Sequence, residues 1–157
     1  MTALPEIRIA EIGDLDAIEA VERRSFPAEE AFSRRQLRYL LTQAQGVCYA
    51  ACRDGAVVGY MALLTRRTAR TLRIYSIAVD PAARGCGVGQ ALIDAAIGLA
   101  RKSGSATVTL EVRTDNAPAI RLYNRNGFRP GKLLRGYYPD TTDARRMTLS
   151  VLPDRRE

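Results

Sequence analysis

The sequence contains no histidine and no tryptophan in its 157 residues. The lack of histidine excludes His-based metal sites, Ser-His triads and Cys-His dyads. We therefore expect no metal ion in the protein. Any acid–base chemistry must come from carboxylates, tyrosines or cysteines.

Cysteine is scarce as well, with only Cys48, Cys52 and Cys86 in the chain. An odd count without a regular framework argues against a disulfide scaffold. Cys48 and Cys52 stand four residues apart in a segment that reads as one strand, so both side chains should point to the same face. We interpret these two as small buried core residues.

Long apolar runs are also missing, because none reaches the roughly 18 residues that a membrane-spanning helix needs. The first residues do not show a basic region followed by an apolar stretch, which is the pattern of a secretory signal. We therefore expect a cytoplasmic protein without a membrane partner.

Basic residues are in excess, with 24 Lys and Arg against 17 Asp and Glu and a net charge of +7. This balance favours an anionic partner, which includes a nucleotide, a nucleic acid or the ribosome, without choosing among them. Arginines cluster at 66–73 and 121–129, but such clusters are more often solvated faces. Because no helix-turn-helix, zinc-finger or aromatic RNA-binding signature accompanies them, direct binding of nucleic acid is not the favoured interpretation.

The length suits a single domain, 1–157, and no linker or repeat interrupts it. Hydrophobic periodicity predicts a strand, two helices, three strands, a helix, a strand, a helix and two strands. The expected ranges are 6–11, 14–24, 33–46, 47–53, 56–64, 72–79, 91–102, 106–113, 116–125, 128–138 and 144–152. Asp14 should cap the helix at 14–24, Ser33 the helix at 33–46, and Asn116 or Asp115 the helix at 116–125. Asp54-Gly55 should join the strands 47–53 and 56–64 in a hairpin.

The strand–helix–strand unit in the middle requires one parallel, right-handed crossover, whereas the hairpins on either side are antiparallel. This order predicts an α/β fold (α+β in some classifications). Its sheet should be mixed and mostly antiparallel, with about seven strands, one central parallel pair and helices on both faces.

A glycine-rich loop, Arg84 to Gly89, follows the strand that ends at Val79 and precedes a helix. A helix N-terminus exposes unpaired N–H groups and a partial positive charge, and glycines let a ligand come close to the backbone. Together these features predict an anion site, although a plain glycine-rich turn fits the spacing equally well. The glycine spacing disfavours a Rossmann loop, and a Walker loop is excluded because no Gly-Lys-Ser/Thr follows.

Two side chains are candidates for proton transfer. Glu111 lies in the alternating strand 107–113, where a strand covered by helices should be almost wholly apolar. It is either a general base or the partner of an arginine, Arg113 or Arg73. Tyr123 has helical spacing from Ile120, and the commoner role for such a tyrosine is core packing, which is compatible with an acid role for its hydroxyl.

The loop Arg84-x-x-Gly87-x-Gly89, preceded by Ile77 to Pro81, resembles the R/Q-x-x-G-x-G/A motif of the GNAT family of N-acetyltransferases. The order of elements is similar to that family over nearly the whole chain. The resemblance implies acetyl-CoA as donor, inserted where the two parallel strands splay apart. It implies donor contacts for Ile77, Ala78, Val79, Arg84, Gly85, Cys86, Gly87, Val88, Gly89 and Gln90, of which the last six would hold the pyrophosphate.

The segment 110–128 resembles the ribosomal-protein-alanine N-acetyltransferase branch, through its L-E-V-R, N-x-x-A-I-x-L-Y and G-F patterns. This resemblance implies that Glu111 accepts a proton, Tyr123 donates one and Asn116 contacts the donor. Tyr137-Tyr138-Pro139 also resembles the branch, where the loop between the last strands borders the acceptor peptide. The alternative for these tyrosines is a turn with two half-exposed rings.

The chain departs from this branch near the second helix, where Glu30-Ala31-Phe32-Ser33 replaces a Pro-Trp-Ser segment. Phe32 is therefore an acceptor-side candidate that carries less weight than the donor loop. Cys86 stands where the loop often has a basic or polar residue. It is either a reactive thiol or an inert variable position, and the second is the more frequent case.

The favoured activity is acetyl transfer to a protein N-terminal α-amine, with the alanine of a ribosomal protein as one such acceptor. A small amine, a polyamine and a lysine side chain are alternative acceptors. A module that senses acetyl-CoA without transferring it is an alternative of another class. The sequence is compatible with a monomer and with a homodimer.

Overall fold

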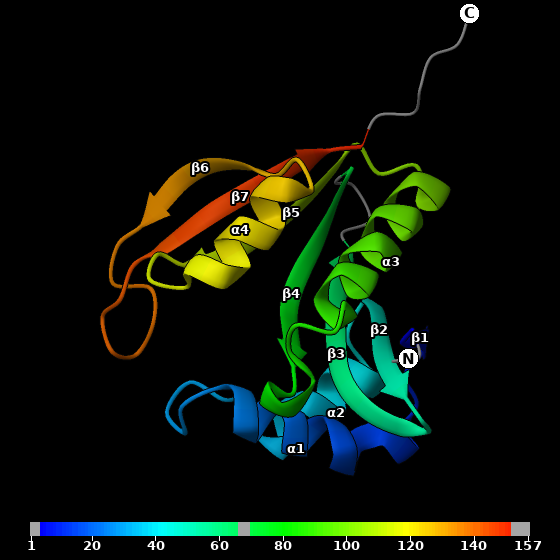
Figure 1. Ribbon diagram of the computed structural model, residues 1–157. Coiled ribbons are helices and arrows are strands. Elements are labelled where there is room, and N and C mark those ends of the chain that lie inside the picture. The colour runs from blue at the N-terminus through cyan, green and yellow to red at the C-terminus, as the bar shows by residue number, and fades with distance from the viewer. Residues whose placement is uncertain (1–3, 66–69, 152–157) are drawn as a thin grey trace, which may run out of the picture. The chain divides into compact units, whose positions relative to one another are not determined.

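The computed structural model describes residues 4–65 and 70–151 and confirms the predicted order of elements (Figure 1). The helices are α1 (Leu15–Ser25), α2 (Arg34–Thr42), α3 (Val88–Ser103) and α4 (Ala117–Arg125), with short 3-10 turns η1 (Ile12–Asp14) and η2 (Pro81–Ala83). The strands are β1 (Glu6–Ile9), β2 (Gly46–Arg53), β3 (Ala56–Thr65), β4 (Thr71–Val79), β5 (Thr107–Arg113), β6 (Arg129–Leu134) and β7 (Ala144–Ser150).

The strands form one seven-stranded sheet in the order β1-β2-β3-β4-β5-β7-β6. β4 and β5 are parallel, paired from Thr71 with Thr107 to Arg73 with Thr109, whereas β1–β2, β2–β3, β5–β7 and β6–β7 are antiparallel. The predicted mixed sheet with a parallel pair is confirmed. The Asp54-Gly55 hairpin is confirmed too, because both residues have positive φ and Arg53 pairs with Ala56.

Some predicted boundaries are wrong for local reasons. α3 begins at Val88 and not at 91, so Gly89 and Gln90 belong to its first turn. β6 ends at Leu134 and not at 138, because Gly136 has a φ of 60° and the chain turns there.

At the N-terminal end, β1 stops at Ile9, two residues earlier than predicted, because a 3-10 turn follows. Asp14 occupies the N-cap position of α1 without capping it through its side chain. Its carboxylate instead accepts hydrogen bonds from Arg8 and from the Glu11 N–H, each at 2.8 Å.

The chain divides into two compact units: the first unit is Met1–Leu64 with Tyr75–Ala95, and the second unit is Thr65–Ile74 with Ala96–Glu157. The core of the first unit joins α1 and α2 to one face of β2 and β3, and contains Leu15, Ile18, Val21, Leu37, Cys48, Ala50, Cys52, Tyr60 and Ala62. The interpretation of Cys48 and Cys52 as buried core residues is thus confirmed. The expectation of a single domain stays a prediction.

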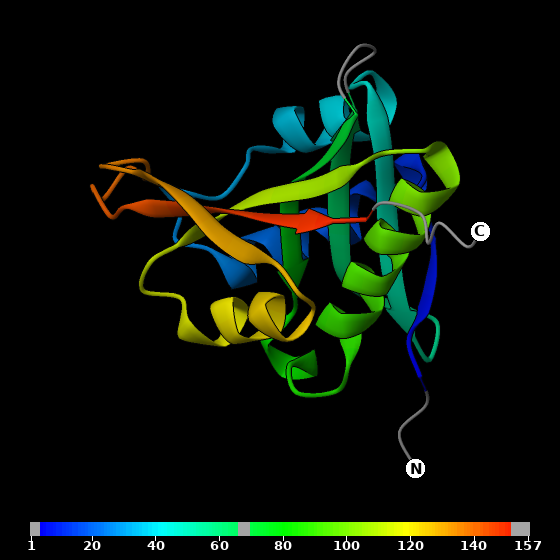
Figure 2. The same cartoon turned by 90° about the horizontal axis from the view of Figure 1, so that it is seen from above.

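In the second unit, α4 runs along one face of β6 and β7 (Figure 2). The buried residues of β5 are Val108, Leu110 and Val112, and Met147 opposite Leu110 on β7 is buried with them. In the part of the chain that the structure describes, no helix is long and apolar enough to cross a membrane.

Candidate active site

In the first unit, hydrogen bonds at Asp80 fix the chain where it leaves the C-terminal end of β4. The Asp80 N–H donates to the Val58 carbonyl at 2.8 Å, and the carboxylate accepts from the Ala82 N–H at 3.0 Å. Arg24 on α1 forms an ion pair with the same carboxylate. The Ala82 N–H and, after it, Arg24 lower the pKa of Asp80. The chain is therefore fixed at the point where the glycine-rich loop begins.

The glycine-rich loop has the backbone that an anion site requires. Gly85 and Gly87 have φ values of 78° and 83°, and a Cβ built on either would meet no atom within 4 Å. The Ala91 N–H donates to the Gly87 carbonyl at 3.0 Å, at the start of the helical bonding of α3. The N–H groups of Val88 and Gly89 lie in the first turn of α3, where a helix provides no acceptor, so their position suits an anion.

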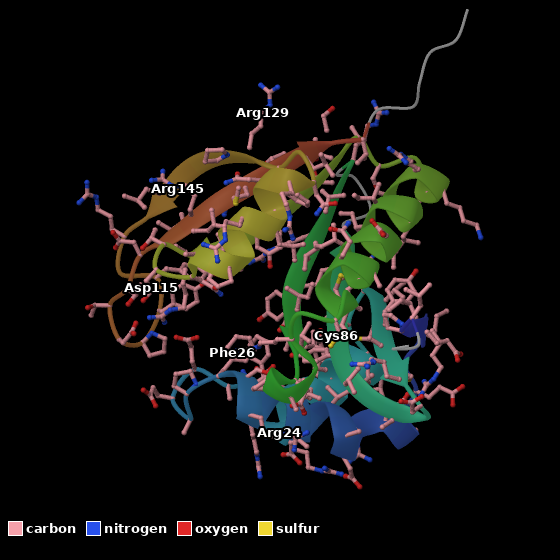
Figure 3. The ribbon with its side chains drawn as sticks, viewed as in Figure 1. Arg24, Phe26, Cys86, Asp115, Arg129 and Arg145 are labelled. Atoms are coloured by element: carbon pink, nitrogen blue, oxygen red, sulfur yellow. The ribbon has the colours of Figure 1, made fainter. Side chains whose placement is uncertain are left out.

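The side chains around this loop contribute little charge. Arg84 is exposed, and its Nε donates to the Val79 carbonyl at 3.3 Å. Cys86 is a free, exposed thiol within the loop (Figure 3). The loop therefore presents backbone donors and one exposed guanidinium.

The start of α3 packs closely on β3, a contact that was not predicted from the sequence. A Cβ added to Gly59 would lie 3.0 Å from the Ala78 carbonyl oxygen and 3.1 Å from a methyl group of Val88. Val88 itself is buried. An apolar strand with one central glycine was the only signal of this close approach in the sequence.

Glu111 lies on β5 with the alternation that the sequence predicts. Its side chain is 6% exposed and forms an ion pair with Arg73 on β4. Of the two arginines that the sequence offered as partners, the structure selects Arg73. Glu111 is therefore a shielded carboxylate with an arginine beside it.

Tyr123 lies on α4, and its ring packs on Phe128 with 5.7 Å between the ring centroids. Burial raises the pKa of Tyr123 to about 12, so the phenol is neutral at pH 7. Among the residues that the structure describes, its hydroxyl has no hydrogen-bond partner. The predicted packing role is thus present, and the role of the hydroxyl as a proton donor stays a prediction.

Asn116 is the N-cap of α4, and its side chain accepts a hydrogen bond from the Ala119 N–H at 3.3 Å. The sequence offered Asn116 or Asp115 as this cap, and the structure selects Asn116, which is exposed. A donor contact by Asn116 stays a prediction.

Arg113 stabilises the loop that follows β6. Its guanidinium bonds the carboxylates of Asp115 and Asp140 and lies 4.9 Å from the centre of the Tyr138 ring. Arg113 lowers the pKa of Asp140 to about 2. Tyr137 packs edge-on against Tyr138, with 5.1 Å between the ring centroids. The two tyrosines therefore form an ordered pair in the second unit.

Phe32, in the first unit, stacks on Tyr75 with 5.4 Å between centroids and 7° between planes. Its N–H donates to the carboxylate of Glu22 at 2.9 Å, and the Tyr60 hydroxyl donates to the same carboxylate at 2.5 Å. Tyr60 also bonds Ser76 at 2.9 Å. Glu22 is only 1% exposed, and burial raises its pKa.

The role of Glu22 was not predicted from the sequence. The available signal was its position four residues after Ile18, on the apolar stripe of α1, where an acidic residue is unusual. Its hydrogen bonds fix the backbone at Phe32.

Comparisons with known proteins agree with this structure. The acetyltransferase (GNAT) family profile matches residues 15–128. The chain is 36% identical over 142 residues to the ribosomal protein bS18-alanine N-acetyltransferase of Escherichia coli (strain K12), covering 86% of this chain and 87% of the relative. It is 34% identical over 149 residues to an N-alpha-acetyltransferase of Sulfurisphaera tokodaii, covering 88% of each.

A solved structure shows the same fold. The crystal structure of the ribosomal-protein-S18-alanine N-acetyltransferase from Escherichia coli superposes with a TM-score of 0.86 at 28% identity, covering 98% of this chain and 99% of that one. The family match spans well over half of the chain, and both curated relatives are N-acetyltransferases. The chain therefore belongs to the GNAT family and is an N-acetyltransferase.

Proposed function

We propose that the protein transfers the acetyl group of acetyl-CoA to the N-terminal α-amine of a protein, with Glu111 accepting a proton and Tyr123 donating one. The observation that carries this proposal is the state of Tyr123, a neutral phenol whose hydroxyl has no partner among the described residues. The acceptor class is supported by relatives named for alanine and N-alpha acetylation.

The donor side rests on the glycine-rich loop. The pyrophosphate of acetyl-CoA is an anion, and the N–H groups of Gly85 to Gln90 suit it because no side chain closes the loop at Gly85 or Gly87. Arg84 adds an exposed positive charge. Backbone groups of Ile77, Ala78 and Val79 would hold the pantetheine arm, and Asn116 is a further donor contact.

The chemistry needs a free amine, a stabilised oxyanion and a proton for the departing thiolate. Glu111 takes a proton from the acceptor amine, directly or through water. A backbone N–H near Val79 stabilises the negative charge that develops on the acetyl oxygen. Tyr123 gives its proton to the thiolate, and with a pKa of about 12 it holds that proton throughout the neutral range.

On the acceptor side, Phe32, Tyr137 and Tyr138 are the aromatic candidates for peptide contact. Aromatic rings supply contact area to a peptide at a low cost in conformational entropy. The alanine of a ribosomal protein is the first acceptor to test, because the bacterial relative is named for it.

The experiment is a thiol-release assay with acetyl-CoA and three acceptors at equal concentration. These are an alanine-initiated peptide, a peptide with a blocked N-terminus and one lysine, and spermidine. We expect release with the first acceptor only. Release with the lysine peptide or spermidine alone would overturn the acceptor class, and binding of acetyl-CoA without release on any acceptor would favour a sensing module.

A further inference from the structure

Charge is divided unevenly between the two units. The described residues of the second unit hold 12 Lys and Arg against 4 Asp and Glu, a net +8. Those of the first unit hold 8 against 11, a net −3. The excess positive charge of the chain therefore lies on the unit that carries Glu111 and Tyr123.

Each of the four carboxylates described in the second unit has a partner. Glu111 pairs with Arg73, and Asp115 and Asp140 both pair with Arg113. Asp143 accepts a hydrogen bond from the Gly136 N–H at 2.9 Å. Among the described residues of this unit, Arg129 and Arg146 form no ion pair with any of these four carboxylates.

Arg146 is the nearest of these arginines to Glu111 in the sheet register. The two residues are direct partners across the antiparallel β5–β7 pair, so their side chains share one face. Directly opposed residues have Cβ atoms about 4.5–5.5 Å apart. Arg73, which reaches Glu111 from β4, lies on the other side. The candidate base is therefore flanked by one arginine that contacts it and a second, exposed one.

Arg129 extends the same face by one strand. It pairs with Thr148 on β7, two residues along from Arg146, and its side chain extends away from β6 (Figure 3). In the part of the chain that the structure describes, neither Arg129 nor Arg146 has an ion-pair partner. Within the described part of the second unit, Arg129 and Arg146 therefore add positive charge to the sheet face that carries Glu111.

This charge disfavours an acceptor that brings only positive charge to the site. We propose that Arg146, with Arg129, selects acceptor peptides that carry a carboxylate in the residues just after the reacting amine. An acidic side chain would neutralise the exposed guanidiniums, whereas a basic one would add to the repulsion. This inference rests on the proposed function, because it assumes a peptide acceptor beside Glu111.

The test compares two alanine-initiated peptides, one with glutamate and one with lysine at positions 2 and 3, in the thiol-release assay at low salt. For the wild-type protein we expect kcat/KM to favour the acidic peptide by about tenfold, a size that corresponds to about 1.4 kcal/mol. Arg146→Gln should bring the ratio close to one, and Arg146→Lys should retain most of the preference. The matched control is Arg121→Gln on α4, which should leave the ratio unchanged.

An unchanged ratio in Arg146→Gln, or a wild-type preference for the basic peptide, would overturn the assignment. A second measurement does not depend on turnover: fluorescence anisotropy with labelled, already acetylated versions of both peptides in the presence of coenzyme A. Tighter binding of the acidic product, lost in Arg146→Gln, is expected. Absence of turnover on every peptide would contradict the proposed function, whereas equal binding of the two products would contradict the role of Arg146.

Discussion

The two units of the molecule present positive charge by different means. The first unit is net acidic in its described residues, yet it holds the loop that suits an anion, because Gly85 to Gln90 offer backbone N–H groups. The second unit is strongly basic, and its charge is carried by side chains such as Arg73, Arg113 and Arg146. A basic composition is therefore a poor guide to where a protein offers backbone N–H groups to an anion.

The units also differ in how they shield a glutamate. Glu22 in the first unit accepts hydrogen bonds from neutral donors, the Phe32 N–H and the Tyr60 hydroxyl, and burial raises its pKa. Glu111 in the second unit has an arginine as its partner. The first arrangement fixes a backbone segment, whereas the second pairs a shielded carboxylate with a cation.

The largest effect is expected from Tyr123→Phe in the second unit. The variant keeps the ring that packs on Phe128 but removes the proton donor. Turnover should fall about 10²- to 10⁴-fold, as is typical for loss of a general acid. Thiol release gives the turnover, and calorimetry should show an unchanged Kd for acetyl-CoA.

The matched control is Tyr39→Phe, which makes the same change at an exposed residue of α2. It should have wild-type turnover. Wild-type turnover in Tyr123→Phe would show that its hydroxyl donates no proton in the reaction. A large loss of acetyl-CoA affinity in Tyr123→Phe would contradict the assignment of donor binding to the first unit and proton donation to the second.

A smaller effect is expected from Gly87→Ala in the loop of the first unit. A left-handed conformation costs an L-residue about 1–2 kcal/mol, so the loop should relax away from a φ of 83°. The N–H groups then move, and the Kd for acetyl-CoA should rise about tenfold, which is about 1.4 kcal/mol. Calorimetry measures this change, and kcat at saturating donor should be largely retained.

Gly98→Ala is the control for this substitution. Gly98 lies in α3 with open space around it, so alanine should stabilise the fold by about 0.5–1 kcal/mol without changing donor affinity. Equal affinity for acetyl-CoA in the Gly87 and Gly98 variants would show that the backbone at Gly87 does not contribute to donor binding.

The smallest effect is expected from Glu22→Gln, and it depends on pH. The folded state holds the proton of Glu22 more tightly than the unfolded chain, because burial raises its pKa above 4.5. Its contribution to the free energy of unfolding is therefore most favourable at low pH, and decreases as pH rises from about 4.5 through the raised value. Glu22→Gln should lack this decrease.

Urea unfolding between pH 4 and 8 measures the difference between the two proteins, which should shift in favour of the glutamine variant as pH rises. Glu29→Gln, the same change at an exposed site, is the control. A pH-independent difference would contradict the raised pKa of Glu22.

Local patterns predicted much of this architecture. Asp54-Gly55 predicted the β2–β3 hairpin, Ser33 predicted the start of α2, and alternation in 107–113 predicted which face of β5 carries Glu111. These features depend on neighbouring residues only, and the sequence displays them directly.

Features that depend on residues far apart in the chain were not predictable. The choice of Arg73 over Arg113 as the partner of Glu111 follows from the parallel register of β4 and β5. The burial of Glu22 requires Tyr60 from β3, and the close approach at Gly59 requires α3. The sequence around a single glutamate or glycine does not show which distant residues it will contact.

The most direct test of the proposed reaction offers two amines on one molecule. The protein is incubated with acetyl-CoA and an alanine-initiated peptide that contains one internal lysine, and tandem mass spectrometry locates the acetyl group. Both amines are then present at the same concentration, so the position reports the preference of the site alone. Acetylation of the α-nitrogen, with the lysine unmodified, is the predicted result, and acetylation confined to the lysine would contradict the account.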